Sequence, residues 1–266
     1  MAEQFGAAFS RVRFSESFEF VSTNPAVADA RLVVFHRDGR KSEIRDLASR
    51  QLGNNSELME QFSAMIAAEH PGGHLLEVGS RARSGNIRRN LIPEGWQYTG
   101  LDVLPGPNVD IVGDVHEISG QFAAGSFHAV MAFSVLEHLL MPWKAIIELN
   151  AVLAPGAIGL FTTHQCWPLH EVPWDFWRFS DRAWDGLLNK ATGFEIIRTV
   201  MSEPAFLVAE RCHAVTNFGF ENGGFLSSSV IFRKIGNTSL TWPVTVADAT
   251  PTQYPVAWNP ETVHQR

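Results

Sequence analysis

Short apolar runs alternate with helical stretches over the middle of this 266-residue chain. In order, the runs read HLLEVG, WQYTGLDV, VDIVGDV, FHAVMAFS and AIGLFTTH. Runs of this length are typical of buried strands. Strands that are joined through helices favour a parallel sheet covered on both faces. The alternation therefore predicts an α/β fold with a doubly wound, mostly parallel sheet.

Two later runs complete the predicted sheet. FEIIRTV and FLSSSVIFRKI are expected to form an edge pair, which gives seven strands, with AERCHAVTNFGFENGG as a long insertion between them. The stretch MPWKAIIELNAVLAPG is amphipathic and predicts a helix that ends at Pro155-Gly156. DRAWDGLLNKATG predicts a further helix.

The segments before and after the predicted sheet have less regular spacing of apolar residues. ARLVVFHRDGRKSEI predicts a hairpin about Asp38-Gly39. NSELMEQFSAMIAAEH predicts a helix capped by Asn55 or Ser56 and stopped by Pro71-Gly72-Gly73, with Leu58, Phe62, Met65 and Ile66 at helical spacing. We expect an N-terminal extension over 1–70 that serves as a lid or dimer element, the α/β domain over 71–236, and an extended, proline-containing arm over 237–266.

Composition narrows the class of protein. With 45% apolar residues the chain can bury one sizeable core without disulfides. A net charge of -7 without clustered basic residues argues against nucleic acid as the main partner. Cys166 and Cys212 provide neither a disulfide framework nor a zinc site and fit a reducing compartment. Without a signal peptide or an apolar run long enough to span a membrane, we expect a cytoplasmic protein.

The loop after the first run, within HLLEVGSRARSGN, begins like a dinucleotide-binding turn. Arg81 and Arg83 then stand where that turn places its second and third glycines. A pyrophosphate needs bare backbone at this point, so a nicotinamide-dependent oxidoreductase is disfavoured. A ligand without phosphates makes no such demand, and an arginine can face its carboxylate. The alternative for Arg81 is a solvated loop charge.

Polar residues end the predicted strands, and ligands of open parallel sheets lie at such carboxyl ends. Asp102 ends the second run, where a carboxylate can accept hydrogen bonds from both hydroxyls of a ribose. Asp114 ends the third run, where the alternative role is a helix N-cap. Phe133-Ser134 ends the fourth run.

The stretch from Leu75 to about Phe194 resembles the class I S-adenosylmethionine-dependent methyltransferases. LLEVGSRARSGNIR, YTGLDVLPGPNVDIVGDVHEI, SFHAVMAFSVLEHL and HEVPWDFWRFS follow that family's order and spacing, and the first is closest to a bacterial branch with a Gly-Ser-Arg motif. The resemblance implies a Rossmann-like fold over the domain at 71–236 and S-adenosyl-L-methionine as the cofactor. It places the methionine portion at Glu77, Gly79 and Ser80, the ribose at Asp102, the adenine edge at Asp114 and Val115, and the cofactor floor at Phe133 and Ser134. We add Arg81 and Val103 to these cofactor-binding residues.

Three histidines are candidates for a general base, since a hydroxyl acceptor must lose its proton and imidazole titrates near neutrality. They are His138 in LEHL, His164 at the end of the fifth run, and His170 in the loop that follows. For His138 the alternative is a residue that supports the site at a helix start. We predict no metal site, because His164, His170, Glu171 and Asp175 match no tight ligand spacing.

The same loop is rich in aromatic residues. Trp167, Trp174 and Trp177, together with Arg178, are predicted to bind the acceptor, since tryptophan rings stack on sugars and flat metabolites. The alternatives are that these tryptophans pack the loop onto the sheet, and that Arg178 only pairs with Asp175.

We therefore expect methyl transfer to a small-molecule acceptor, most simply a hydroxyl of a sugar or secondary metabolite, by in-line displacement. A non-catalytic protein with the methyltransferase fold is the alternative, followed by the nicotinamide oxidoreductase. The sequence does not decide whether the protein forms homo-oligomers.

Overall fold

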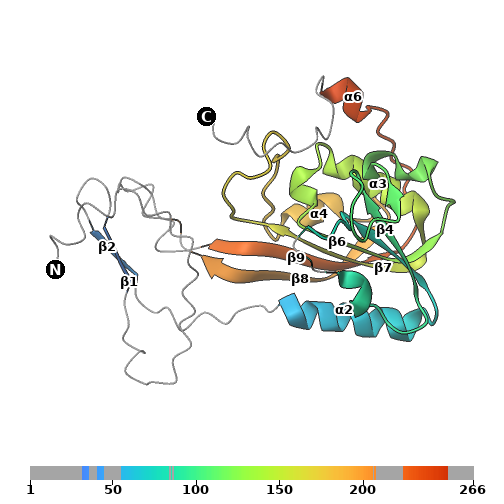
Figure 1. Cartoon of the computed structure of the whole chain (residues 1–266), viewed down its shortest axis with the longest axis horizontal. Helices are drawn as coiled ribbons and strands as arrows, with labels where there is room; N and C mark the ends of the chain where they lie inside the picture. Colours follow the sequence, from blue (N-terminus) through green and yellow to red (C-terminus); the bar gives the residue numbers. More distant parts are fainter. Residues whose placement is uncertain are drawn as a thin grey trace. The chain divides into compact units, whose positions relative to one another are not determined.

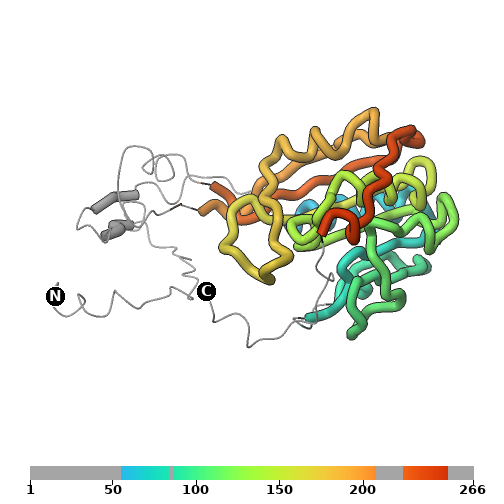
Figure 2. The backbone as a smooth tube through the Cα atoms, turned by 90° about the horizontal axis from the view of Figure 1, so that it is seen from above, coloured from blue at the N-terminus to red at the C-terminus, as the bar shows by residue number. Residues whose placement is uncertain are grey.

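A seven-stranded sheet forms the centre of the computed structural model, which describes residues 32–35, 41–44, 55–83, 85, 87–205, 207 and 224–250. The strand order is β5-β4-β3-β6-β7-β9-β8. Figure 1 labels β4, β6, β7, β8 and β9 of this sheet, and Figure 2 shows the backbone path from above. The strands from β3 to β7 run parallel, and β9 is antiparallel to both β7 and β8. The predicted α/β fold with a mostly parallel sheet and a closing edge pair is confirmed. The strands are β3 (His74–Val78), β4 (Gln97–Asp102), β5 (Ile111–Val112), β6 (Phe127–Phe133), β7 (Leu153–His164), β8 (Phe194–Ala205) and β9 (Gly224–Lys234).

Helices cover the sheet on both faces, with α2 on one face and α3 and α4 on the other (Figure 1). Successive side chains of β6 point to opposite faces of the sheet. Ala129 and Met131 pack in the cluster under α2, and Val130 and Ala132 pack in the cluster under α3. The described helices are α2 (Asn55–Glu69), α3 (Pro142–Val152), α4 (Ala183–Leu187) and α6 (Val246–Ala249), and the short 3-10 helices are η2 (Arg88–Leu91), η3 (Val115–Gly120) and η4 (Leu136–His138).

The helix predicted from NSELMEQFSAMIAAEH is confirmed as α2. Leu58, Phe62 and Ile66 are buried against the sheet, and Met65 packs at the margin of the same core. Asn55, its first residue, accepts a hydrogen bond of 3.1 Å from the Ser229 hydroxyl of β9. The compact unit that contains the sheet therefore includes α2.

Two predicted helices differ in extent from those observed. The helix expected to reach Pro155-Gly156 ends at Val152, because Leu153 already pairs with Phe127 of β6 and both later residues lie within β7. In the second, only Ala183–Leu187 is helical. Leu188 already leaves the helical conformation, with φ of -115° and ψ of 88°, and the Asn189 side-chain oxygen then accepts a 2.9 Å hydrogen bond from the Ala191 amide in a turn.

The chain divides into two compact units, and the first spans Met1–Arg50 with Glu210–Cys212. In it, β1 (Leu32–Phe35) and β2 (Lys41–Ile44) pair antiparallel, as predicted for the hairpin. Its predicted turn at Asp38-Gly39 and most of the predicted insertion, residues 209–223, lie outside the described residues.

The predicted C-terminal arm is described as far as residue 250. Trp242 packs edge-on against Trp143 of α3, and its indole N–H contacts the Met141 sulfur at 3.3 Å. Among the described residues, no helix has the length and apolar character needed to cross a membrane.

Candidate active site

A tight turn joins β3 to the loop that follows it. Gly79 has a left-handed φ of 73°, and a Cβ at this position would overlap the side chain of Val135. The Gly79 and Ser80 amides both donate to the Leu101 carbonyl of β4, at 2.8 and 3.1 Å. Glycine is required here both by conformation and by the close approach of Val135.

Asp102 is the last residue of β4, the strand that pairs with β3. Its carboxylate accepts from the Arg81 amide at 3.2 Å and from the Leu104 amide at 2.9 Å. The Arg81 guanidinium Nε lies 3.7 Å from the same carboxylate. The Ser80 hydroxyl is buried against Gly100 of β4 and has no hydrogen-bond partner among the described residues. At this strand end the turn therefore brings the Asp102 carboxylate and the Arg81 guanidinium together.

Glu77 lies beneath this turn and is almost completely buried. Its carboxylate accepts from the Tyr98 hydroxyl and from Arg88, the latter at 3.2 Å. Burial raises the pKa of Glu77, and these two hydrogen bonds oppose the rise. Arg88 also lies 4.2 Å over the ring of Phe133. Sequence reasoning did not identify Arg88 or Tyr98, because their partners are distant in the chain.

Asp114 takes the capping role that the sequence left as an alternative. Its carboxylate accepts from the His116 amide at 2.9 Å and from the His116 ring at 2.6 Å. The other ring nitrogen of His116 accepts from the Met141 amide at 3.2 Å. Asp114 therefore fixes η3 against the start of α3, and an adenine contact stays a prediction.

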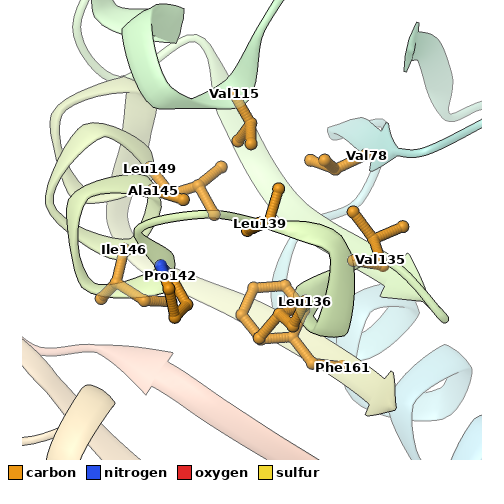
Figure 3. Close-up of a pocket in the computed structure, with 11 residues that line it drawn as sticks. Val78, Val115, Val135, Leu136, Leu139, Pro142, Ala145, Ile146, Leu149 and Phe161 are labelled. Carbon is orange, nitrogen blue, oxygen red and sulfur yellow. The ribbon is translucent and has the colours of Figure 1, made fainter. Parts of the chain in front are cut away.

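Val115 belongs to a small apolar cavity between the sheet and α3 (Figure 3). The space holds about one water molecule and has an apolar lining, so it is a gap in core packing. Val78 and Val135 line it as well, directly behind the Gly79 turn. The residues around the cavity are Val78, Val115, Ala132, Val135, Leu136, Leu139, Pro142, Ala145, Ile146, Leu149 and Phe161.

Ser134 directly follows β6, the strand on the other side of β3. It is exposed and has a left-handed φ of 52°, with its amide donating to the Thr162 carbonyl at 2.8 Å. Such strain in a non-glycine residue is common at functional sites. Phe133 and Val103 are half-buried at the ends of β6 and β4. Three adjacent strands thus bring Gly79, Asp102 and Ser134 to one edge of the sheet.

A second polar cluster lies at the carboxyl end of β7, around the buried carboxylate of Glu137. The Thr163 hydroxyl donates to Glu137 Oε2 at 2.5 Å. Glu137 Oε1 lies 3.2 Å from His164 Nε2 and 3.9 Å from His138 Nε2. The His170 ring packs edge-on against both histidines, at centroid distances of 4.7 and 5.4 Å. The three predicted histidines therefore meet at one place.

Backbone hydrogen bonds hold the loop after β7 over this cluster. The Phe176 and Trp177 amides donate to the Glu137 carbonyl, at 2.8 and 3.2 Å. The Phe179 amide donates to the His164 carbonyl at 2.9 Å, and His138 Nδ1 donates to the Trp174 carbonyl at 2.5 Å. The position of His170 in the fold depends on these contacts.

Asp175 accepts hydrogen bonds from other residues of the same loop. It accepts from Arg178 in a two-point contact, at 2.6 and 2.8 Å, and from the His170 amide at 2.9 Å. Arg178 also donates to the Trp167 and Pro168 carbonyls. The pairing of Asp175 with Arg178 is observed, and the guanidinium is engaged by the loop itself.

Burial and hydrogen bonding set the charges of this cluster. Burial raises the pKa of Glu137 to about 7 and lowers the pKa of His164 to about 4. Burial also lowers the pKa of His138. Although burial alone would raise it, hydrogen bonds from Arg178 lower the pKa of Asp175 to about 2. At neutral pH, His164 is therefore an uncharged imidazole.

The predicted acceptor-binding tryptophans take different positions. Trp167 is 41% exposed and stacks on His164 at a centroid distance of 4.8 Å. Trp177 donates to the Leu139 carbonyl and packs edge-on against Trp143, so it packs the loop onto α3. Trp174 contacts Phe176 and holds His138 through its carbonyl. Of the three, Trp167 is the ring that is both exposed and beside the histidines.

Glu137 is the central residue that sequence reasoning missed. The sequence clue to Glu137 was its place beside His138 in LEHL, directly after the end of a predicted strand. In an otherwise apolar segment, a carboxylate at that point had no visible partner, because His164 and His170 approach only in the folded chain.

The sequence matches a family model described as "Methyltransferase domain" over residues 42–199. No curated protein matches the chain. The structure is similar to an S-adenosylmethionine-dependent methyltransferase from Archaeoglobus fulgidus, with 14% identity, 68% and 95% of the two chains covered, and a TM-score of 0.47. It is also similar to the 1,6-didemethyltoxoflavin-N1-methyltransferase of Burkholderia thailandensis, with 13% identity, 73% and 96% coverage, and a TM-score of 0.48.

Proposed function

The chain belongs to the methyltransferase-domain family that its sequence matches over residues 42–199, and on this premise we propose that it uses S-adenosylmethionine to methylate a small molecule. The observation that carries the proposal is the Asp102 carboxylate at the end of β4, with the Arg81 guanidinium 3.7 Å from it. S-adenosylmethionine combines a ribose with an amino-acid carboxylate, and Asp102 and Arg81 would provide one partner for each. The acceptor would be a hydroxyl compound, because its proton must leave and the uncharged imidazole of His164 lies beside the exposed ring of Trp167.

The residues present fit this cofactor. Asp102 would accept from the ribose hydroxyls, and the tight turn at Gly79 and Ser80 would border the methionine portion. Arg81, beside Asp102, would face the carboxylate of the methionine portion. When bound, the cofactor supplies a sulfonium methyl group for in-line displacement, a reaction in which positioning contributes about 7–11 kcal/mol.

The loop after β7 would position the acceptor. Trp167 offers an exposed ring for stacking on a sugar or flat metabolite. His164, stacked beneath Trp167, would accept the hydroxyl proton at its imidazole. Because the guanidinium of Arg178 already bonds to Asp175, its role is to hold this loop in place.

Binding of S-adenosylhomocysteine to the full chain tests the proposed function. We expect saturable heat in calorimetry and a stabilisation against unfolding of about 2.7 kcal/mol at a hundredfold excess over Kd. Methyl transfer from labelled S-adenosylmethionine to a panel of sugars and phenolic metabolites then identifies the acceptor. Absence of heat and of stabilisation would instead support the non-catalytic alternative. Protection by a nicotinamide cofactor alone would support the oxidoreductase.

Asp102→Ala is expected to weaken S-adenosylhomocysteine binding about ten- to hundredfold, since hydrogen bonds to charged groups each contribute about 1.5–3 kcal/mol. Calorimetric titration measures the change. Asp110→Ala is the matched control, because Asp110 also bonds to the β4 backbone, at the Gly100 amide, yet lies away from the strand end. Equal affinities of the Asp102→Ala variant and the wild type would remove Asp102 from the ribose role.

A further inference from the structure

The histidine cluster contains an arrangement that the proposed methyl transfer does not by itself explain. One ligand atom each from Glu137, His138 and His170 lies within 4.8 Å of the others. These residues come from η4 and from the loop after β7, so the site forms only when that loop folds back. Sequence analysis predicts no metal site, because the spacing of Glu137-His138 and His170 matches no compact ligand motif.

Glu137 provides the first argument for a bound cation. Its side chain is completely buried, and Oε1 has no hydrogen-bond partner among the described residues, whereas Oε2 is bonded to Thr163. A buried carboxylate oxygen without a partner is costly, since it loses its hydration. The contact of 3.2 Å with His164 Nε2 lacks hydrogen-bond geometry and so does not satisfy this oxygen.

The two imidazoles provide the second argument. His138 Nδ1 donates to the Trp174 carbonyl, which leaves the lone pair on Nε2, the atom that lies 3.9 Å from Glu137 Oε1. His170 Nδ1 faces two acceptors, the Pro168 carbonyl at 3.2 Å and the Asp175 carboxylate at 3.3 Å. These acceptors favour the tautomer with the proton on Nδ1, which has its lone pair on Nε2.

This pattern is the one that metal-binding histidines show. A ligating imidazole usually donates its other N–H to a backbone carbonyl or a carboxylate, which fixes the ring and its tautomer. His138 has the carbonyl partner and His170 has both kinds. Two ligands bound at about 2.0–2.2 Å in tetrahedral geometry lie about 3.3–3.6 Å apart, so the 3.9 Å between Glu137 Oε1 and His138 Nε2 would shorten by a few tenths of an ångström on binding.

We propose that Glu137, His138 and His170 bind a divalent transition-metal ion such as Zn²⁺. Two imidazoles and one carboxylate favour such an ion over Mg²⁺ or Ca²⁺, which prefer sites made of oxygen ligands. Three protein ligands leave a coordination position open, as in catalytic zinc sites. An oxygen of the acceptor would take that position beside His164, a step that rests on the proposed function.

Metal titration of the full, untagged chain tests the site without cofactor or acceptor. After treatment with a chelator, Zn²⁺, Co²⁺ and Mg²⁺ are titrated separately by calorimetry, and the Co²⁺ sample is also examined by visible absorption. We expect one Zn²⁺ or Co²⁺ per chain with visible d–d bands from Co²⁺, and at least tenfold weaker Mg²⁺ binding. His170→Ala is expected to weaken Zn²⁺ binding more than about a hundredfold, and Asp175→Asn, which weakens the support of His170 and the pairing with Arg178 but removes no ligand, about tenfold.

His74→Ala is the matched control, since His74 starts β3 at the amino edge of the sheet and bonds to Thr99. Its Zn²⁺ affinity is expected to stay within twofold of the wild type. Glu137→Gln provides a second ligand variant, and circular dichroism verifies its folding. The inference is overturned if the wild type binds no Zn²⁺, or if His170→Ala binds it as tightly as the wild type. S-adenosylhomocysteine titration of the same samples keeps the two proposals separate: metal binding without cofactor binding contradicts only the proposed function.

Discussion

Replacing His164 with glutamine is expected to lower turnover about 10²–10³-fold, while the affinity for S-adenosylhomocysteine stays within about twofold. His164 ends β7 with an uncharged imidazole, stacked under the exposed ring of Trp167. Glutamine keeps much of the size and polarity but cannot accept the hydroxyl proton. Single-turnover kinetics with the acceptor found by screening, together with calorimetry for S-adenosylhomocysteine, measures both quantities.

His74→Gln is the matched control for this experiment. Both histidines lie at strand ends of the same sheet, but His74 starts β3 and His164 ends β7. Turnover by His74→Gln is expected to stay within about twofold of wild type, because general-base catalysis requires hydrogen-bond reach of the acceptor. If His164→Gln turns over as fast as wild type, another group is the base. A parallel loss of cofactor affinity would assign His164 a structural role.

The architecture could be predicted because the local spacing of apolar residues indicates which side chains are buried. The spacing of Leu58, Phe62 and Ile66 predicts α2, and the apolar runs predict the strands of the sheet. The end of α3 could not be predicted from Pro155, because Leu153 pairs with a strand more than twenty residues earlier. Pairing across the sheet overrides the local stop signal at that point.

Some residues of the candidate site could likewise be predicted from the sequence, and others could not. Gly79, Asp102 and Ser134 could be placed because ligands lie at the carboxyl ends of parallel strands, and sequence order identifies those ends. The sequence also left both roles of Asp114 open, and its capping of η3 depends on the neighbouring His116. Glu137 was missed because its partners come from β7 and the following loop, and no local pattern encodes that approach.

Gly79→Ala is expected to lower the free energy of unfolding by about 2–4 kcal/mol, through backbone strain and overpacking together. The φ of 73° disfavours any side chain, and the new methyl group would overlap Val135. Behind Val135 the apolar cavity holds only about one water molecule, so that side chain has little room to withdraw. Urea denaturation of wild type and variant measures the loss.

Gly95→Ala separates the two contributions, because Gly95 has a φ of 80° but nothing within 4 Å of its added Cβ. We expect it to lose about 1–2 kcal/mol, the strain contribution alone. In the Val135→Ala background the loss at Gly79 should shrink by about 1 kcal/mol or more, since the overlapping methyl group is gone. Equal losses at Gly79 and Gly95, unaffected by Val135→Ala, would contradict the close packing of η4 against this turn. The same packing joins the end of β3 to the segment that carries Glu137 and His138, so it connects the proposed cofactor side of the site to its histidine cluster.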